Sequence, residues 1–120
     1  CSELGGPYRQ LLYEGFFKDD KKDGTHKSWY ENGQLKTEVS YKDGQNEGSM
    51  KSWYENGQLE FESNYKNGKK NGLTKSWYEN GQLKTEVSYK DGEEEGLFKY
   101  FFENGRLMIE SNWKDGELIP

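Results

Sequence analysis

The segment Lys27–Leu35 reads Lys-Ser-Trp-Tyr-Glu-Asn-Gly-Gln-Leu, and close copies of it start at Lys51, Lys75 and Lys99. The copies start 24 residues apart, and residues 27–44 are identical to residues 75–92. Self-similarity at such a period indicates a repeat array in which each unit is one supersecondary element. A chain of 120 residues therefore holds one array rather than several domains. We divide it into an N-terminal tether (1–7), a partial unit (8–24) and full units at 25–48, 49–72, 73–96 and 97–120.

Each unit is predicted to be a β-hairpin. Asn-Gly stands at 32–33, 56–57, 80–81 and 104–105 between runs of β-prone residues. This dipeptide favours a two-residue type I′ turn, because both residues tolerate a positive φ. Such a turn pairs Tyr30 with Leu35, Trp29 with Lys36, and Lys27 with Glu38. The Lys–Glu pair recurs in every full unit, which supports the register, since facing pairs stabilise a sheet.

The fold class follows from the hairpins and the composition. The chain has no Ala and 15 Gly, and aromatic residues make up 16% of it, so a helical protein is excluded. We predict an all-β, elongated, twisted single-layer antiparallel sheet of about nine strands. Strand alternation predicts a buried face with Tyr30, Leu35, Val39 and Tyr41, and a charged face with one aromatic residue per unit. Because no helix covers this sheet, pairing with a second copy in a homodimer is one way to cover it.

Composition excludes several functions. The net charge is −5 and no apolar run approaches the roughly 20 residues that span a bilayer, so neither nucleic-acid binding nor a transmembrane helix is expected. His26 is the only histidine, which excludes a Ser-His-Asp triad and a histidine metal site within one chain. Its equivalents in the other units are Met50, Thr74 and Phe98, so we interpret His26 as structural. We predict no catalytic residue, no metal site and no cofactor.

An aromatic ladder is the candidate binding site. Trp29, Trp53, Trp77 and Phe101 occupy equivalent positions and should lie in one row on the charged face, about 10 Å apart. Such a row is suited to bind an extended peptide, a glycan or the surface of a protein partner, because Trp offers large contact area at a small cost in entropy. The alternative is that these rings stack on the alkyl stems of Lys36, Glu60 and Lys84 and only stiffen the sheet.

Cys1 is the only cysteine and opens the chain, followed by Ser-Glu-Leu-Gly-Gly-Pro. This start is similar to that of a mature bacterial lipoprotein, whose N-terminal cysteine carries the lipid. It predicts lipid attachment at Cys1, a flexible tether and a location in the cell envelope. The alternative is an arbitrary fragment boundary, with a cytoplasmic location.

The repeat itself resembles a known family. The pattern Gly-x-x-Lys-Ser-Trp-Tyr-Glu-Asn-Gly-Gln-Leu-Lys-Thr-Glu-x-x-Tyr-Lys-Asp-Gly is similar to the bacterial MORN repeat variant, over about residues 11–116. The first unit departs from the pattern at Asp19-Asp20, as expected of an end cap. The resemblance implies a non-catalytic scaffold or interaction module that binds a protein partner. It also implies two alternatives, an antitoxin of a toxin–antitoxin pair, which requires a cytoplasmic location, and a phospholipid-binding module.

Overall fold

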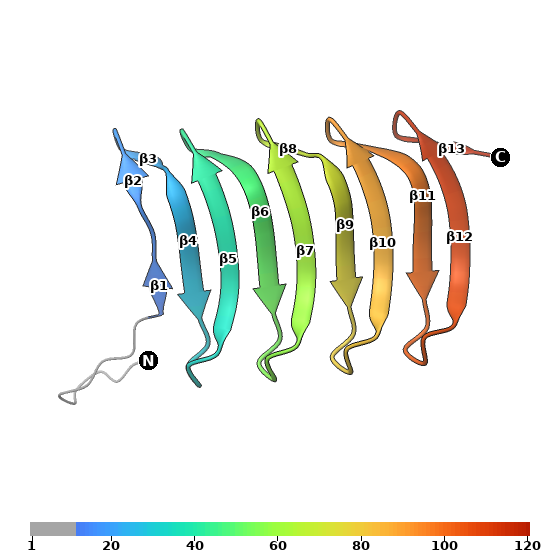
Figure 1. Ribbon diagram of the computed structural model, residues 1–120, viewed down its shortest axis with the longest axis horizontal. Coiled ribbons are helices and arrows are strands. Elements are labelled where there is room, and N and C mark those ends of the chain that lie inside the picture. The colour runs from blue at the N-terminus through green and yellow to red at the C-terminus, as the bar shows by residue number, and fades with distance from the viewer. Residues whose placement is uncertain (1–11) are drawn as a thin grey trace.

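The structure, a computed structural model, describes residues 12–120, and no helix is present among them (Figure 1). Its long strands are β4 (Gly24–Trp29), β5 (Leu35–Lys42), β6 (Gln45–Trp53), β7 (Leu59–Lys66), β9 (Gly72–Trp77), β10 (Leu83–Lys90), β11 (Glu93–Phe101) and β12 (Leu107–Lys114). The short strands are β1 (Tyr13–Glu14), β2 (Phe17–Lys18), β3 (Lys21–Lys22), β8 (Lys69–Lys70) and β13 (Glu117–Ile119).

The strands form one open antiparallel sheet with sequential neighbours. The path runs β1-β4-β5-β6-β7-β9-β10-β11-β12-β13, with β8 beside β7 and a separate β2–β3 pair. The described residues extend over 60 × 40 × 13 Å, and this thickness leaves room for one layer only. The predicted single-layer array of hairpins is confirmed. The predicted number of strands was too low, because the short strands at the ends and at one turn raise it to eleven in this sheet.

The type I′ turns were predicted at the Asn-Gly sites, but they lie at the other end of the strands. Tyr41 pairs with Asn46 and Lys42 with Gln45, so Asp43-Gly44 is the two-residue loop. Both of its residues have positive φ, 50° and 83°, as a type I′ turn requires. The equivalent turns are at Asn67-Gly68, Asp91-Gly92 and Asp115-Gly116.

The Asn-Gly sites form a different loop. The Tyr30 amide donates to the Gln34 carbonyl (2.8 Å) and the Gly33 amide to the Tyr30 carbonyl (3.0 Å), which closes a three-residue loop, Glu31–Gly33. Only Gly33 in this loop has a positive φ, 91°, as expected of a type I turn followed by a left-handed residue. The Asn32 side chain instead accepts a hydrogen bond from the Gln34 amide (2.9 Å), an alternative that asparagine offers the backbone. The prediction of a two-residue turn here was wrong for this reason.

The longer loop changes the register next to it. Ser28 pairs with Thr37 and Lys27 with Glu38, as predicted, but Trp29 pairs with Leu35, and a register shift separates these pairs. Lys36 is the extra residue of a β-bulge. Directly opposed residues share a face, so Leu35 lies with Trp29 and not with Tyr30 on the predicted buried face. The predicted pairs Tyr30–Leu35 and Trp29–Lys36 were wrong. The extra residue Lys36 shifts the pairing by one position, so Leu35, which precedes it in the strand, lies on the other face of the sheet from the one that strict alternation predicts.

Neither face of the sheet is fully buried. Among the described residues, Val87 is the only buried hydrophobic residue, and His26, Ser63 and Thr74 are the buried polar ones. They lie in one row across the middle of the sheet, in which Ser63 and Thr74 share a hydrogen bond of 2.7 Å between their hydroxyls. The array is therefore held by strand pairing and cross-strand contacts rather than by a packed core.

His26 anchors the N-terminal cap. Its Nε2 donates to the Phe16 carbonyl (2.9 Å), and its Nδ1 is hydrogen-bonded to the Tyr13 hydroxyl. The rings of Phe17 and Tyr41 contact it edge-on, with centroids 5.3 and 5.0 Å away. These contacts agree with a structural role for His26.

The glycine of the three-residue loop provides a test of the turn. Gly81 has a φ of 90°, so Gly81→Ala should lower the free energy of unfolding by about 1–2 kcal/mol, since an L-residue is strained there. Gly81→Asn is the matched variant and should lose less, because asparagine tolerates positive φ. Urea unfolding of both proteins measures the difference. Equal losses would contradict the left-handed conformation.

Candidate functional site

The aromatic ladder shares its face of the sheet with four leucines, and together they form an apolar row, here called the Trp–Leu row. Trp29 pairs with Leu35, Trp53 with Leu59, Trp77 with Leu83, and Phe101 with Leu107. All of these side chains are half-buried except Leu107, which is 48% exposed. Because strands are about 4.8 Å apart, the row is about 35 Å long. The structure therefore places the four predicted residues on one face in one line.

The leucines were missed as members of this row. Strict alternation of side chains predicts that the leucines lie on the face opposite the ladder. The bulge at Lys36 and at the equivalent positions places them on the same face as the ladder. The polar ends of the proposed stacking partners have other contacts. The ammonium groups of Lys36 and Lys84 stand 5.5 Å from the ring centroids of Tyr30 and Tyr78, and Glu60 accepts a hydrogen bond from Ser52 (3.5 Å). The alternative that the ladder rings stack on the alkyl stems of these side chains stays a prediction.

A row of alternating charge lies beside the Trp–Leu row on the same face. Each lysine of this charge row precedes an aromatic residue of the ladder by two positions, as Lys27 precedes Trp29. Opposed residues continue from strand to strand in the order Glu14, Lys27, Glu38, Lys51, Glu62, Lys75, Glu86, Lys99, Glu110. Lysine and glutamate side chains are 3.7 Å apart in the first hairpin and 3.6 Å apart in the next two. The face thus carries an apolar line edged by a line of alternating sign.

A tyrosine of each hairpin clasps the next hairpin at the ladder. The hydroxyls of Tyr30, Tyr54 and Tyr78 donate to the backbone carbonyls of Trp53, Trp77 and Phe101, at 2.6, 2.6 and 2.7 Å. We call these three bonds the tyrosine clasps. Because each acceptor belongs to a ladder residue, the clasps fix the backbone from which the ladder rings project.

Burial raises the pKa of the clasp tyrosines above the usual 10.0. For Tyr30 and Tyr54, removal from water is the largest cause and the negative charge of Glu60 the next. For Tyr78, removal from water is followed by its interaction with Tyr100. The hydroxyls therefore keep their protons, and the clasps their donors, through the neutral range.

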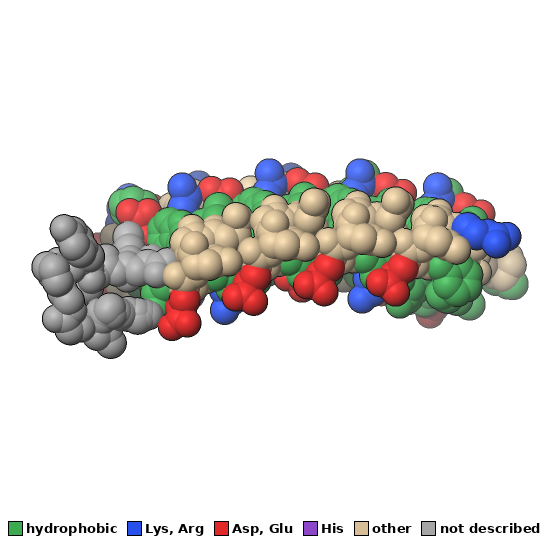
Figure 2. All heavy atoms as spheres, turned by 90° about the horizontal axis from the view of Figure 1, so that it is seen from below, with side chains coloured by type: hydrophobic (Ala, Val, Ile, Leu, Met, Phe, Trp, Pro, Cys, Tyr) green, Lys and Arg blue, Asp and Glu red, His purple; other side chains and the backbone are tan. Residues whose placement is uncertain are grey.

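Asparagines and backbone amides reinforce the contacts between hairpins. The Asn56 side chain donates to the Glu79 carbonyl (3.0 Å), and Asn80 does the same to Glu103 (3.0 Å). At the other end of the strands, the Gly92 amide donates to the Lys70 carbonyl (2.9 Å). Figure 2 looks onto the Asn-Gly loops and shows them as similar protrusions of uncharged groups between charged side chains. Hydrogen bonds at both ends thus space the hairpins regularly.

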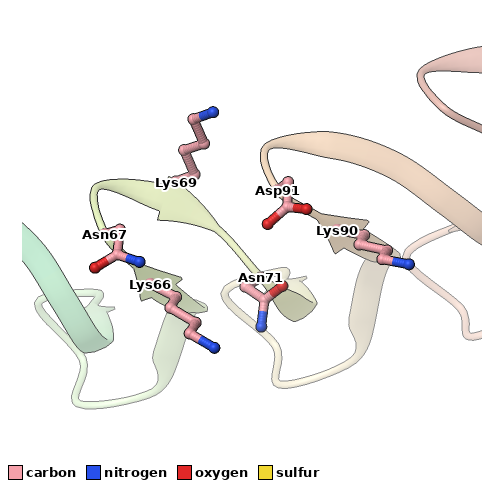
Figure 3. A pocket seen from close by; sticks show the side chains of 6 residues that line it. All are labelled: Lys66, Asn67, Lys69, Asn71, Lys90 and Asp91. Atoms are coloured by element: carbon pink, nitrogen blue, oxygen red, sulfur yellow. The ribbon is translucent and has the colours of Figure 1, made fainter.

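The hollow between two Asp/Asn-Gly turns does not form a convergent site. It has a volume of about 440 Å³ and is lined by Lys66, Asn67, Lys69, Asn71, Lys90 and Asp91. In Figure 3 the three lysine side chains point in different directions, so their ammonium groups do not meet on one ligand position.

The described residues contain no group of three or more His, Cys, Asp or Glu side chains suited to a metal ion. They also contain no helix that is long and apolar enough to cross a membrane. Cys1 and the tether at 1–7 lie outside the described residues, so lipid attachment at Cys1 stays a prediction.

Comparison with known families agrees with this geometry. A model described as MORN repeat variant matches residues 22–43, 46–67, 70–91 and 94–115, four tandem segments of 22 residues each. The chain belongs to the MORN repeat variant family. The family is generally a non-catalytic repeat module. A search of curated proteins found no match.

The charge row of this MORN array provides a prediction. Lys51 lies between Glu38 and Glu62, so Lys51→Glu places three carboxylates in line and should lower the free energy of unfolding by about 1–2 kcal/mol at low salt. High salt should reduce the loss by screening. The control is Lys42→Glu, an exposed position opposite Gln45, which should change stability little. Urea unfolding at two salt concentrations tests this, and equal effects of the two variants would contradict it.

The tyrosine clasps predict a pH effect. Because the pKa of each clasp hydroxyl is raised in the folded state, the unfolded chain loses these protons first as the pH rises. The contribution to stability is therefore complete below pH 10 and declines above it. The variant with Tyr30, Tyr54 and Tyr78 changed to Phe should be less stable at pH 7 and lose less stability above pH 10 than the native chain. Denaturant unfolding between pH 7 and 11 measures both, and equal slopes above pH 10 would disprove the pKa shift.

Proposed function

We propose that this MORN array is a non-catalytic interaction module that binds a protein partner along the Trp–Leu row. The observation that supports the proposal is an apolar row on one face of the sheet, half-exposed to solvent and attached to a backbone held by the tyrosine clasps. Aromatic side chains on a rigid support bind with little loss of conformational entropy.

The charge row gives this surface its selectivity. Alternating lysines and glutamates run parallel to the Trp–Leu row, so a partner gains from side chains of matching alternating charge. Complementary charges contribute mainly to specificity and to the rate of association. The same alternation leaves no basic cluster on this face, which disfavours anionic lipid surfaces as the ligand. The antitoxin and phospholipid-binding roles and lipid anchoring in the cell envelope stay predictions from the sequence.

Replacement of Trp29, Trp53 and Trp77 with Ser tests the site. Recovery of the partner from an extract of the source organism should fall at least tenfold, because the variant removes most of the apolar contact area. The control changes Lys36 and Lys84 to Ser on the opposite face, and it should recover the partner as the native chain does. Melting curves verify that both proteins are folded.

Full recovery by a folded triple variant would show that the Trp–Leu row is not the binding site. If the triple variant unfolds, the single change Trp53→Ser in the middle of the row replaces it. The Trp53→Ser variant should still recover less of the partner than the Lys36 and Lys84 control does. Equal recovery by the two proteins would reject the proposal.

A further inference from the structure

The outer edge of β12 at Leu107–Ser111 is the C-terminal edge of the sheet. β13 pairs with β12 only at Asn112, Trp113 and Lys114, and on this outer side no strand among the described residues pairs with the stretch before them. Figure 1 shows β13 crossing one end of β12 and leaving the rest uncovered. The main-chain groups of an edge strand are available to pair with another strand.

This edge is more apolar than the same positions of the preceding unit. Phe102, Met108 and Ile109 occupy the positions of Tyr78, Lys84 and Thr85 one unit earlier. They are 46%, 41% and 50% exposed, and Figure 2 shows hydrophobic side chains gathered at the C-terminal end. Edge strands are usually protected by charged side chains, and this stretch has apolar ones next to Glu110. The edge is therefore suited to accept a strand.

The charge row specifies a basic residue in that strand. Glu86 in the interior pairs with Lys75 on one side and Lys99 on the other. Glu110 pairs with Lys99 on its inner side, and no described residue faces it on its outer side. A lysine in the incoming strand would continue the alternation.

The Trp–Leu row specifies an aromatic residue two positions after that lysine. The interior leucines, such as Leu59 and Leu83, are half-buried, and each pairs with the ladder residue of its own hairpin. Leu107 has Phe101 on its inner side only and is 48% exposed. A ring on its outer side would extend the row by one member.

We propose that the outer edge of β12 binds an extended segment of a partner protein as an antiparallel strand. The segment has an apolar residue, a lysine, any residue and an aromatic residue in that order. Its lysine pairs with Glu110, and its ring lies beside Met108 and Leu107 at the end of the Trp–Leu row. The chain contains the template for this arrangement, since Met50-Lys51-Ser52 pairs with the corresponding edge of β5 and Trp53 follows directly. Main-chain hydrogen bonds supply affinity in strand addition, and the alternate side chains supply selectivity.

The edge suits a single strand of another protein better than a second copy of this chain. The stretch Leu107–Ser111 contains no basic residue, so no antiparallel pairing of it with itself places a lysine opposite Glu110. The charge row also ends in an acid at its N-terminal end, Glu14, which disfavours end-to-end stacking of copies. Phe102 carries no hydroxyl, so a hairpin docked here cannot be clasped as the internal hairpins are.

A labelled peptide with the sequence of residues 45–54 tests the proposal. We expect saturable binding to the 120-residue chain by fluorescence anisotropy, at least about fivefold weaker when the peptide lysine at position 51 is changed to glutamate, since a facing pair turns from attractive to repulsive. Glu110→Lys in the protein should reverse this preference. The control Glu103→Lys makes the same charge change in the Asn-Gly loop of the same unit and should keep the native preference.

Equal affinity of the two peptides for the native chain, or no saturable binding up to about 1 mM, would overturn the proposal. This comparison changes only the peptide and uses the native chain, so it tests the proposal even if Glu110→Lys impairs folding. Binding should persist in the variant with Ser at positions 29, 53 and 77, which separates this edge from the Trp–Leu row. Loss of peptide binding in that variant, if it is folded, would assign the peptide to the row instead.

Discussion

The tyrosine clasp is the interaction on which the regular form of this array depends. A sheet 13 Å thick has no second layer, so the hydrophobic effect that fixes most folds contributes little here. Val87 is the only buried hydrophobic side chain among the described residues. The hairpins are instead joined by strand pairing and by hydrogen bonds between loops, such as that from Tyr54 to the Trp77 carbonyl. A typical bond of this kind contributes about 0.5–1.5 kcal/mol, and the repeat supplies it at every step.

This way of holding the hairpins together leaves both faces of the sheet available to a partner. One face carries the Trp–Leu row and the charge row, and the other carries tyrosines with lysines above them, such as Lys70 above Tyr89 at 4.9 Å. Because the period of the sequence equals the period of the structure, each kind of side chain forms a line. A line of equivalent side chains is suited to an extended or repetitive partner, whereas a pocket is suited to a compact ligand.

The end units differ from the interior for physical reasons. At the N-terminal end, His26 replaces the smaller or apolar residues of its row and bonds to Tyr13 and Phe16, so the first long strand is covered by its own cap. At the C-terminal end, Phe102, Met108 and Ile109 replace Tyr78, Lys84 and Thr85 of the preceding unit and stay exposed. One edge is thus closed by hydrogen bonds and the other presents apolar side chains. This asymmetry gives the array a direction that its nearly identical internal repeats lack.

The sequence by itself determined the repeat, the order of the strands, the Lys27–Glu38 register and the line of Trp29, Trp53 and Trp77, because period and alternation are properties of the chain alone. Which turn type each Gly-containing site adopts was decided by the tertiary structure. Asn32 bonds to the Gln34 amide and also to the next hairpin, at the Glu55 carbonyl (3.3 Å), and the loop lengthens to three residues. The resulting bulge moves Leu35 to the ladder face, a change that alternation cannot predict because it assumes an uninterrupted strand. The exposed edge of β12 is likewise a tertiary property, since a residue at an edge and one in the interior can have the same neighbours in sequence and differ only in whether another strand lies beside them.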